Sequence, residues 1–268
     1  MNEKSARSRV RYANEFAHVL ESGDAQSLLQ LSAEKRLHVM KALACLSKFL
    51  GCHDTTWMTL KLKYNLKWTT GNGSLDIFEH CYGDDSENLD TMLKWLRQMR
   101  QELPVSYYNV FLFCTLTGLR TNECFEAIRL IKDPETFKTY YQPSKQTLEH
   151  FRFPELFIRR TKAAYISLVN QEIVDIAKNG ITISPCNYMK VMYFVVRSKK
   201  LRMNMHYCRK VYSSYLRQYA GIESEVIDLL QGRTPNTVFA KHYFRPNLQQ
   251  YTEKVLDSLY KLEQTIES

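Results

Sequence analysis

Apolar residues recur at helical spacing along most of the chain. In the first third, four such residues follow one another at intervals of three or four positions: Val39, Leu43, Leu46 and Leu50. This is the spacing of one face of an α-helix. Ser32 precedes the run as an expected N-cap, and Gly51 follows it as an expected left-handed stop. The pattern predicts a helix between these two residues.

A polar, glycine-rich stretch, TTGNGSLDIFEHCYGDDSEN (69–88), interrupts the helical pattern. Clusters of Gly, Ser, Asn and Asp between periodic segments are typical of loops and linkers. A second helical run, LDTMLKWLRQMRQEL, follows directly. We therefore place a domain boundary near residue 84, which divides the chain into residues 1–84 and 85–268.

The second part begins with helical patterns and then changes. YYNVFLFCTLTG predicts a buried helix that ends at Gly118, and Thr121 is the expected cap of the next helix, NECFEAIRLI. In ELFIRRTKAAYISLV (155–169), the β-rich runs LFI and YISLV flank the polar RRTK. This predicts an antiparallel hairpin with Lys162 at or near its turn. The expected fold is mainly α with one small antiparallel β-sheet.

Charge and composition narrow the classes of partner. The chain has 268 residues, a formal net charge of +9 and a pI of about 9.1, which favours a polyanion such as nucleic acid. Its longest apolar runs, VFLFC and VMYFVV, are too short to span a bilayer, and no signal-peptide pattern opens the sequence. We expect no membrane partner and a place in the cytoplasm.

The seven cysteines show no CxxC motif and no Cys/His spacing of a metal site. Most lie in apolar helical contexts, so we interpret them as reduced core residues of an intracellular protein. We expect no metal ion and no cofactor.

The motif TGLRTNE (117–123) is a candidate anion site. Arg120 lies between a glycine helix stop and a threonine cap, beside a predicted helix N-terminus where backbone N–H groups favour an anion. Glu123 follows in the first turn and can brace the arginine. The alternative is an ordinary surface arginine in a loop.

The segment MHYCRKVYSSYLRQYAG (205–221) predicts a helix with two different faces. His206 and Arg209 are three residues apart and share one face, which Ser213 continues. The opposite face is a stripe suited to burial: Cys208, Val211, Tyr212, Tyr215 and Tyr219. The helix would thus present His206 and Arg209 together, unless this face is merely a solvated basic surface.

The last motif is LLQGRTPNTVFAKHYFRP (229–246). Gly232 is expected to end one helix and Pro235 to open another, with Arg233 at the junction. Tyr243 lies near the end of that second helix, just before Pro246. It is either an aromatic anchor on a basic helix or a nucleophile.

Together, these residue types suit transesterification of a phosphodiester. A phenol has a pKa near 10 and attacks phosphorus only when another group accepts its proton. Guanidinium groups match the charge on the non-bridging oxygens, and a lysine can protonate the departing alkoxide. Arginine and histidine can replace Mg²⁺ in stabilising that charge, in keeping with the absence of a carboxylate cluster.

TGLRTNE, HYCR and QGRTPNTVFAKHYFRP, in this order, resemble the motifs of the tyrosine recombinase (integrase) family, especially those of archaeal virus and plasmid integrases. The resemblance covers about residues 90–250, and the helical part before it resembles the family's core-binding domain. It implies a helical core-binding domain followed by a catalytic domain. The implied activity is site-specific recombination of DNA through a 3′-phosphotyrosine intermediate.

The resemblance also implies a role for each candidate residue. Tyr243 would be the nucleophile, Arg120 and Arg209 would clamp the phosphate, and His206 would assist proton transfer. Lys162 would be the general acid for the 5′-oxygen, although sequence does not fix the register of its hairpin, in which Arg159 and Arg160 are neighbours. Glu123 would support the site. Arg233 occupies a position usually held by histidine or tryptophan and would add a phosphate contact.

Further implications concern partners. Such proteins clamp duplex DNA at attachment sites and act as homotetramers without metal or ATP. The C-terminal segment shows an apolar stripe that docks either on a neighbouring protomer or on its own domain: Leu248, Tyr251, Val255, Leu259 and Leu262. Basic residues are candidates for DNA contact: Arg7, Arg9, Arg11, Lys41, Lys48, Lys61, Lys63 and Arg160.

Two alternative functions remain from the sequence. A type IB topoisomerase-like enzyme shares the phosphotyrosine chemistry, but the short N-terminal domain and the archaeal-type final motif argue against it. A catalytically silent helical DNA-binding protein would have the same charge and the same helices without forming the covalent adduct.

Overall fold

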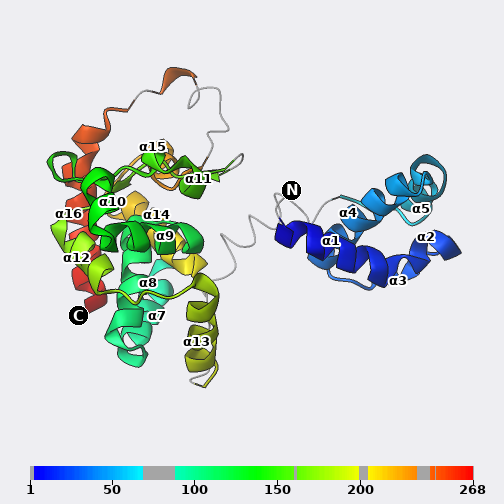
Figure 1. The fold of residues 1–268 in the computed structure, drawn as a ribbon, viewed down its shortest axis with the longest axis horizontal. Helices are drawn as coiled ribbons and strands as arrows, with labels where there is room; N and C mark the ends of the chain where they lie inside the picture. The colour runs from blue at the N-terminus through cyan, green and yellow to red at the C-terminus, as the bar shows by residue number, and fades with distance from the viewer. Residues whose placement is uncertain are drawn as a thin grey trace. The chain divides into compact units, whose positions relative to one another are not determined.

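The computed structural model describes residues 3–68, 88–159, 162–198, 205–233, 242–244 and 246–267. The chain divides into two compact units, Met1–Asp84 and Asp85–Ser268. We call them the N-terminal unit and the C-terminal unit and describe each by itself. The structure is mainly α-helical with two small antiparallel sheets (Figure 1), which confirms the predicted fold class.

The N-terminal unit is built around helix α4, against which α1 packs. Its described helices are α1 (Glu3–Phe16), α2 (His18–Ser22), α3 (Gln26–Leu29), α4 (Ala33–Phe49), a π-helical turn (His53–Trp57) and α5 (Met58–Lys63). The core includes Val39, Leu43 and Trp57, all fully buried.

The predicted ends of α4 are confirmed. The Ser32 hydroxyl accepts a hydrogen bond from the Lys35 amide at 3.4 Å, and Gly51 has the left-handed φ of 71°. The predicted apolar stripe is shorter than expected, because Leu50 is 58% exposed. It is the C-cap residue of the helix, one position beyond the last helical residue, Phe49.

The C-terminal unit surrounds the buried helix α8 with α7, α9, α12, α14 and α16 (Figure 1). Its helices are α7 (Leu89–Glu102), α8 (Val105–Thr117), α9 (Thr121–Lys132), α10 (Pro134–Tyr140), α11 (Pro154–Phe157), α12 (Gln171–Asn179), α13 (Pro185–Ser198), α14 (His206–Gln218), α15 (Ser224–Leu230) and α16 (Leu248–Glu267). The predicted burial of α8 and its stop at Gly118 are confirmed: Val110, Phe111 and Phe113 are fully buried, and Gly118 has a φ of 62°.

The strands form two sheets of different composition. β1 (Tyr141–Gln142), β2 (Thr147–Leu148) and β5 (Ser167–Leu168) make one antiparallel sheet, whereas β3 (Ile158–Arg159) and β4 (Lys162–Ala163) make a separate hairpin. The predicted hairpin around RRTK is confirmed, with Arg159 opposite Lys162. Its predicted extent was wrong, because residues 156–157 end α11 and residues 167–168 pair with β2 instead.

The C-terminal helix α16 packs on its own unit. It lies against α7, α14, α8 and β5, and its buried side chains include Val255, Leu259 and Leu262. The Arg97 side chain donates a hydrogen bond to the carbonyl of Thr265 at 2.9 Å. The sequence left open whether this apolar stripe docks on a neighbouring protomer or on its own domain. In the structure, the stripe packs on its own domain.

Six of the seven cysteines belong to the part of the chain that the structure describes, and all six are free thiols. Cys114, Cys124 and Cys208 are buried, as predicted, but Cys45 and Cys186 are exposed. Within the described ranges, every helix is too short or too polar to cross a bilayer.

Candidate active site

Two helix ends that stop at left-handed glycines meet in the C-terminal unit. α8 ends at Gly118, and α15 is followed by Gly232, which has a φ of 63°. A Cβ atom added to Gly232 would lie 2.5 Å from the carbonyl oxygen of Ala163 and 2.6 Å from the amide nitrogen of Ala164. The turn at Gly232 thus packs directly on the β4 backbone, and only glycine fits there.

Arg209, on α14, joins these two helix ends. Its guanidinium donates one hydrogen bond to the carbonyl of Gly118 and another to the carbonyl of Gln231, the latter at 3.0 Å. The predicted shared face with His206 was therefore only partly right. Arg209 is 8% exposed and its side chain lies inside the unit, whereas His206 is exposed.

Burial and the nearby charge of Arg120 lower the pKa of Arg209 to about 10, with Arg233 adding to the repulsion and Glu123 opposing it. The guanidinium still remains protonated at neutral pH. Arg120 and Arg233, which come from different parts of the sequence, thus both repel the charge of Arg209 at this junction.

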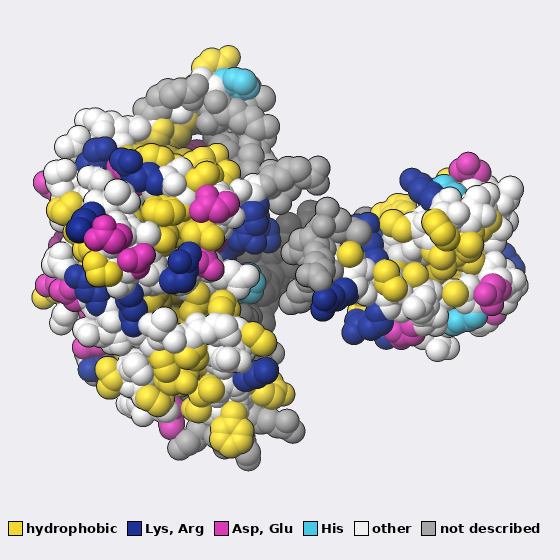
Figure 2. Space-filling view, viewed as in Figure 1, with side chains coloured by type: hydrophobic (Ala, Val, Ile, Leu, Met, Phe, Trp, Pro, Cys, Tyr) yellow, Lys and Arg dark blue, Asp and Glu magenta, His cyan; other side chains and the backbone are white. Residues whose placement is uncertain are grey.

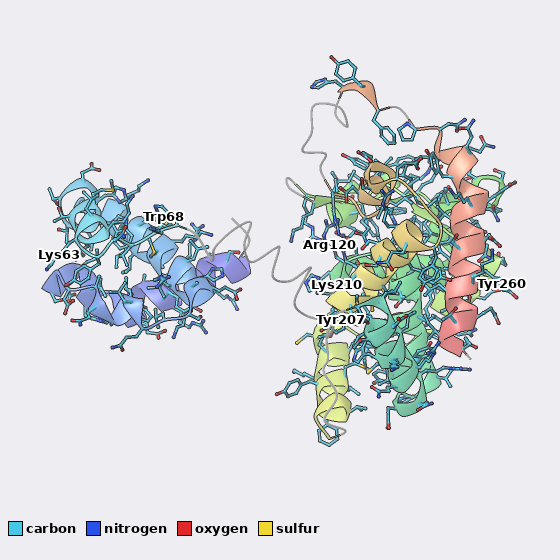
Figure 3. The ribbon with its side chains drawn as sticks, turned by 180° about the vertical axis from the view of Figure 1, so that it is seen from behind. Lys63, Trp68, Arg120, Tyr207, Lys210 and Tyr260 are labelled. Atoms are coloured by element: carbon cyan, nitrogen blue, oxygen red, sulfur yellow. The ribbon has the colours of Figure 1, made fainter. Side chains whose placement is uncertain are left out.

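Arg120 occupies the N-cap position of α9, so the prediction that Thr121 caps this helix was wrong; Thr121 is its first residue. The Arg120 amide donates to Glu123 Oε2 at 3.1 Å, which replaces the expected threonine cap. Its guanidinium donates to Glu123 Oε1 at 3.0 Å and to the carbonyl of Gly232 at 3.1 Å. Figure 3 shows Arg120 beside α14, from which Lys210 and Tyr207 extend.

Glu123 is a buried carboxylate, with its side chain 1% exposed. It forms ion pairs with Arg120 and with Arg159, each at 3.0 Å. A buried charge requires such partners, because removing a carboxylate from water costs several kcal/mol unless it is paired and hydrogen-bonded. Arg159 had no predicted role. Its place in the predicted hairpin was the available signal, but the sequence does not fix the register of that hairpin.

The β3–β4 hairpin reaches the same junction. Lys162 lies directly opposite Arg159, and the Ala163 amide donates to the carbonyl of Gly232 at 3.3 Å. Arg233 follows Gly232 and forms an ion pair with Asp228 at 2.8 Å, with both side chains about half exposed. Arg160 lies outside the described residues.

His206 and Tyr243 complete the predicted set. His206 is the first residue of α14, one turn before Arg209. Tyr243 is 73% exposed. Its short segment, 242–244, lies at the outer end of the C-terminal unit, away from Arg120 (Figures 1 and 3). The helix predicted to begin at Pro235 falls mainly on residues 234–241, outside the described part of the chain. The structure therefore brings the arginines, Glu123 and the hairpin together, but not Tyr243.

The N-terminal unit has a cavity of its own, between α1 and α4, with a volume of about 400 Å³. The described residues that line it carry basic or hydroxyl side chains, and none of them is acidic: Ser5, Ser8, Arg9, Tyr12, His38 and Lys41. In the space-filling view, dark-blue side chains gather over α1 (Figure 2). Such a lining suits an anionic group.

Only two of the predicted DNA-binding residues of this unit, Arg9 and Lys41, line the cavity. Arg11 lies over the Tyr12 ring at 4.7 Å, and Lys63 over the Tyr64 ring at 5.1 Å. Arg7, Lys48 and Lys61 are not part of its lining. Ser8 and His38 were missed, since neither shows a sequence pattern that distinguishes it from surface residues.

Within the described ranges, no group of three or more His, Cys, Asp or Glu side chains is arranged to hold a metal ion. Most of the described side chains that meet at the junction are cationic. They are suited to a phosphate.

A cationic junction of this kind suits a protein that binds phosphate groups, and a family model identifies the class of protein. The model described as archaeal phage integrase matches residues 87–258, which is more than half of the chain. The chain therefore belongs to the archaeal phage integrase family. Neither the curated proteins nor the solved structures gave a match.

Proposed function

We propose that this protein is a site-specific DNA recombinase that cleaves and rejoins duplex DNA through a 3′-phosphotyrosine at Tyr243. The main support is the convergence of Arg120 and Arg209 on consecutive carbonyls, those of Gly232 and Gln231. Guanidinium groups held in place by protein partners stabilise the charge that develops on a phosphate in the transition state.

In the proposed reaction, the Tyr243 oxygen attacks phosphorus as the P–O5′ bond breaks. The phenolic proton passes to His206, and Lys162 donates a proton to the departing 5′-oxygen, which leaves as a hydroxyl. The new P–O bond to tyrosine conserves the energy of the broken ester. A 5′-hydroxyl can therefore reverse the step without ATP.

Tyr243 must move into the site for this chemistry. Ten residues separate it from Arg233, and an extended chain of that length spans at most about 35 Å. Its 73% exposure also distinguishes it from tyrosines of the core such as Tyr140, which is fully buried. We propose that DNA binding draws Tyr243 to the arginine junction of its own chain or of another copy.

Arg233 adds a phosphate contact in this proposal. Its ion pair with Asp228 is about half exposed on both sides, and exposed pairs of this kind contribute at most about 1 kcal/mol. A DNA phosphate can therefore replace Asp228 as the partner of Arg233. Glu123 holds Arg120 in position through their ion pair.

The proposed partner is a duplex attachment site of viral or plasmid DNA in the host cytoplasm. The cavity with Arg9, His38 and Lys41 takes a backbone phosphate. Four copies act together on two paired sites. Because α16 covers its own unit, contact between copies uses either another surface or a released α16.

A covalent trapping experiment tests this function. The protein is incubated with candidate attachment-site duplexes that carry a nick next to the cleavage position, and the products are separated under denaturing conditions. We expect a protein–DNA adduct that maps to Tyr243 and disappears in Tyr243→Phe. A protein that binds these duplexes but never forms the adduct is a silent DNA-binding protein. One that relaxes supercoils but never resolves four-way junctions is topoisomerase-like.

A further inference from the structure

Glu123 forms ion pairs with two arginines from distant parts of the chain, Arg120 and Arg159. Its Oε1 atom accepts hydrogen bonds from Arg120 Nη1 and Arg159 Nη2, both at 3.0 Å. Its Oε2 atom accepts from the Arg120 amide at 3.1 Å. The side chain of Arg159 is 47% exposed, whereas that of Glu123 is 1% exposed. The buried carboxylate thus links the α9 N-terminus to the β3–β4 hairpin.

The hairpin depends on such links for its position. Each strand has two residues, and an isolated two-stranded hairpin is at best marginally stable in water. β3 is tied to Glu123 through Arg159, and β4 is tied to Gly232 through the 3.3 Å hydrogen bond of Ala163. These two attachments lie on opposite strands of the same short hairpin.

The register places two cations side by side. Arg159 and Lys162 are direct cross-strand partners, so their side chains leave the hairpin on the same face. Like charges directly opposite each other are destabilising. The carboxylate of Glu123 offsets this repulsion, because it pairs with Arg159 on the side where Lys162 lies.

We infer that Arg159 is a positioning residue, which acts through Glu123 to hold the β3–β4 hairpin so that Lys162 reaches the leaving 5′-oxygen. The inference rests on the proposed function. It assigns Arg159 to the proton-transfer step and not to the binding of the phosphate. Loss of Arg159 should therefore impair cleavage only where the leaving group needs a proton.

A substrate with sulfur in place of the bridging 5′-oxygen separates these roles. Tyr243 attacks the same phosphorus, but the P–S bond breaks and a thiolate leaves. A thiol has a pKa of about 8.5, far below that of an alcohol, so the departing sulfur needs no proton donor. A variant with a misplaced Lys162 should cleave this substrate normally, whereas a variant with a damaged phosphate clamp should fail on both.

The experiment compares single-turnover cleavage of the two substrates by the full-length wild type and by Arg159→Ala. General acid catalysis contributes about 10²–10⁴-fold, so we expect Arg159→Ala to cleave the oxygen substrate at least about tenfold more slowly. Its rate on the sulfur substrate should stay within about twofold of the wild type. Equal losses on both substrates would overturn the inference, and so would wild-type rates on both.

Arg152→Ala is the matched control. Arg152 is 45% exposed and pairs with the buried Glu149, whose side chain is 4% exposed, so the environment is similar but belongs to the 3₁₀ turn at residues 150–152. We expect wild-type rates on both substrates. If Arg159→Ala unfolds at lower denaturant than this control, Arg159→Gln, which keeps a polar side chain beside Glu123 but removes the positive charge, replaces it with the same expected contrast. A wild type that forms no adduct on either substrate refutes the proposed function itself.

Discussion

Arg209 and Gln231 are hydrogen-bonded to each other in both directions. The Arg209 guanidinium donates to the Gln231 carbonyl at 3.0 Å, and the Gln231 side-chain amide donates to the Arg209 carbonyl at 2.8 Å. This exchange fixes α14 to the turn that follows α15. The chain from that turn leads to Tyr243, so the arginine proposed to bind phosphate also holds the turn from which the segment of the proposed nucleophile continues.

The two arginines proposed to bind phosphate should therefore lower the stability of the protein by different amounts when each is removed. Arg209→Ala leaves the carbonyls of Gly118 and Gln231 without their buried donor, and we expect a loss of about 2–4 kcal/mol in unfolding free energy. Arg120→Ala should lose about 1 kcal/mol, because Glu123 keeps Arg159 and Gly232 keeps the Ala163 amide. Urea unfolding measures the difference, and equal midpoints for the two variants would contradict it.

Cleavage should fail in both variants. We expect the rate of adduct formation to fall by at least about 10²–10³-fold when one charge-stabilising donor is lost. Duplex binding by Arg120→Ala should largely survive, because many other cations of the chain remain available to contact the DNA backbone. Gel-shift and adduct assays on the same samples test this. A parallel loss of binding and cleavage in Arg120→Ala would assign the residue to binding alone.

Gly232 leaves no room for a larger side chain, so its substitution should be costly. Gly232→Ala places a Cβ atom 2.5 Å from the Ala163 carbonyl oxygen, in addition to the left-handed backbone cost of about 1–2 kcal/mol. Gly221→Ala is the matched control, since its φ is 58° and its added Cβ would meet nothing within 4 Å. We expect Gly221→Ala to show the backbone cost alone and Gly232→Ala to lose more stability and most cleavage. Similar unfolding midpoints would refute this packing argument.

Local patterns predicted the helices well, because their signals lie within a few residues. The stops at Gly51 and Gly118 and the burial of α8 follow from spacing and glycine chemistry. The pairing of strands was harder to predict from the sequence. Residues 167–168 pair with β2 and not with the adjacent hairpin, and such a choice depends on contacts that no short window contains.

The sequence motifs predicted which residues belong to the candidate site, but they predicted fewer of the contacts between those residues. Arg120, Arg209 and Glu123 were found from their motifs, and the structure places them at one junction. The burial of Arg209 was missed, because a guanidinium at helical spacing with a histidine resembles a solvated face. Arg159 was missed because its partner, Glu123, is 36 residues away in the chain.

His150 should make the stability of the C-terminal unit depend on pH. It is fully buried between the Tyr140 hydroxyl at 2.7 Å and the Ser167 hydroxyl at 2.8 Å, and burial lowers its pKa to about 3. Above about pH 6.5 the imidazole is neutral in both the folded and the unfolded chain. Between pH 6.5 and 3 only the unfolded chain takes up the proton, so stability falls as pH falls, by about 1.4 kcal/mol per unit from this residue.

Unfolding by urea at pH 7 and pH 5 measures this effect. We expect the wild type to lose about 2 kcal/mol from His150 over this interval. His150→Gln cannot take up the proton and should show a smaller loss. His53→Gln, at a partly exposed histidine of the N-terminal unit, is the control and should leave the pH dependence of the C-terminal unit unchanged. The same pH dependence in wild type and His150→Gln would assign it to carboxylates.

The cavity of the N-terminal unit should govern DNA affinity and not the chemical step. Arg9, His38 and Lys41 line it together, whereas Lys63 lies over the Tyr64 ring elsewhere in that unit. We expect Arg9→Ala and Lys41→Ala each to weaken duplex binding and to reduce the slope of log affinity against log salt by about one, the signature of one lost phosphate contact. Lys63→Ala should change neither the affinity nor the slope.

Adduct formation at saturating DNA should stay at the wild-type rate in all three variants, because the arginine junction and Tyr243 belong to the other unit. A slope that Lys63→Ala lowers as much as Lys41→Ala does would show that binding uses diffuse charge and that the cavity has no special part in it.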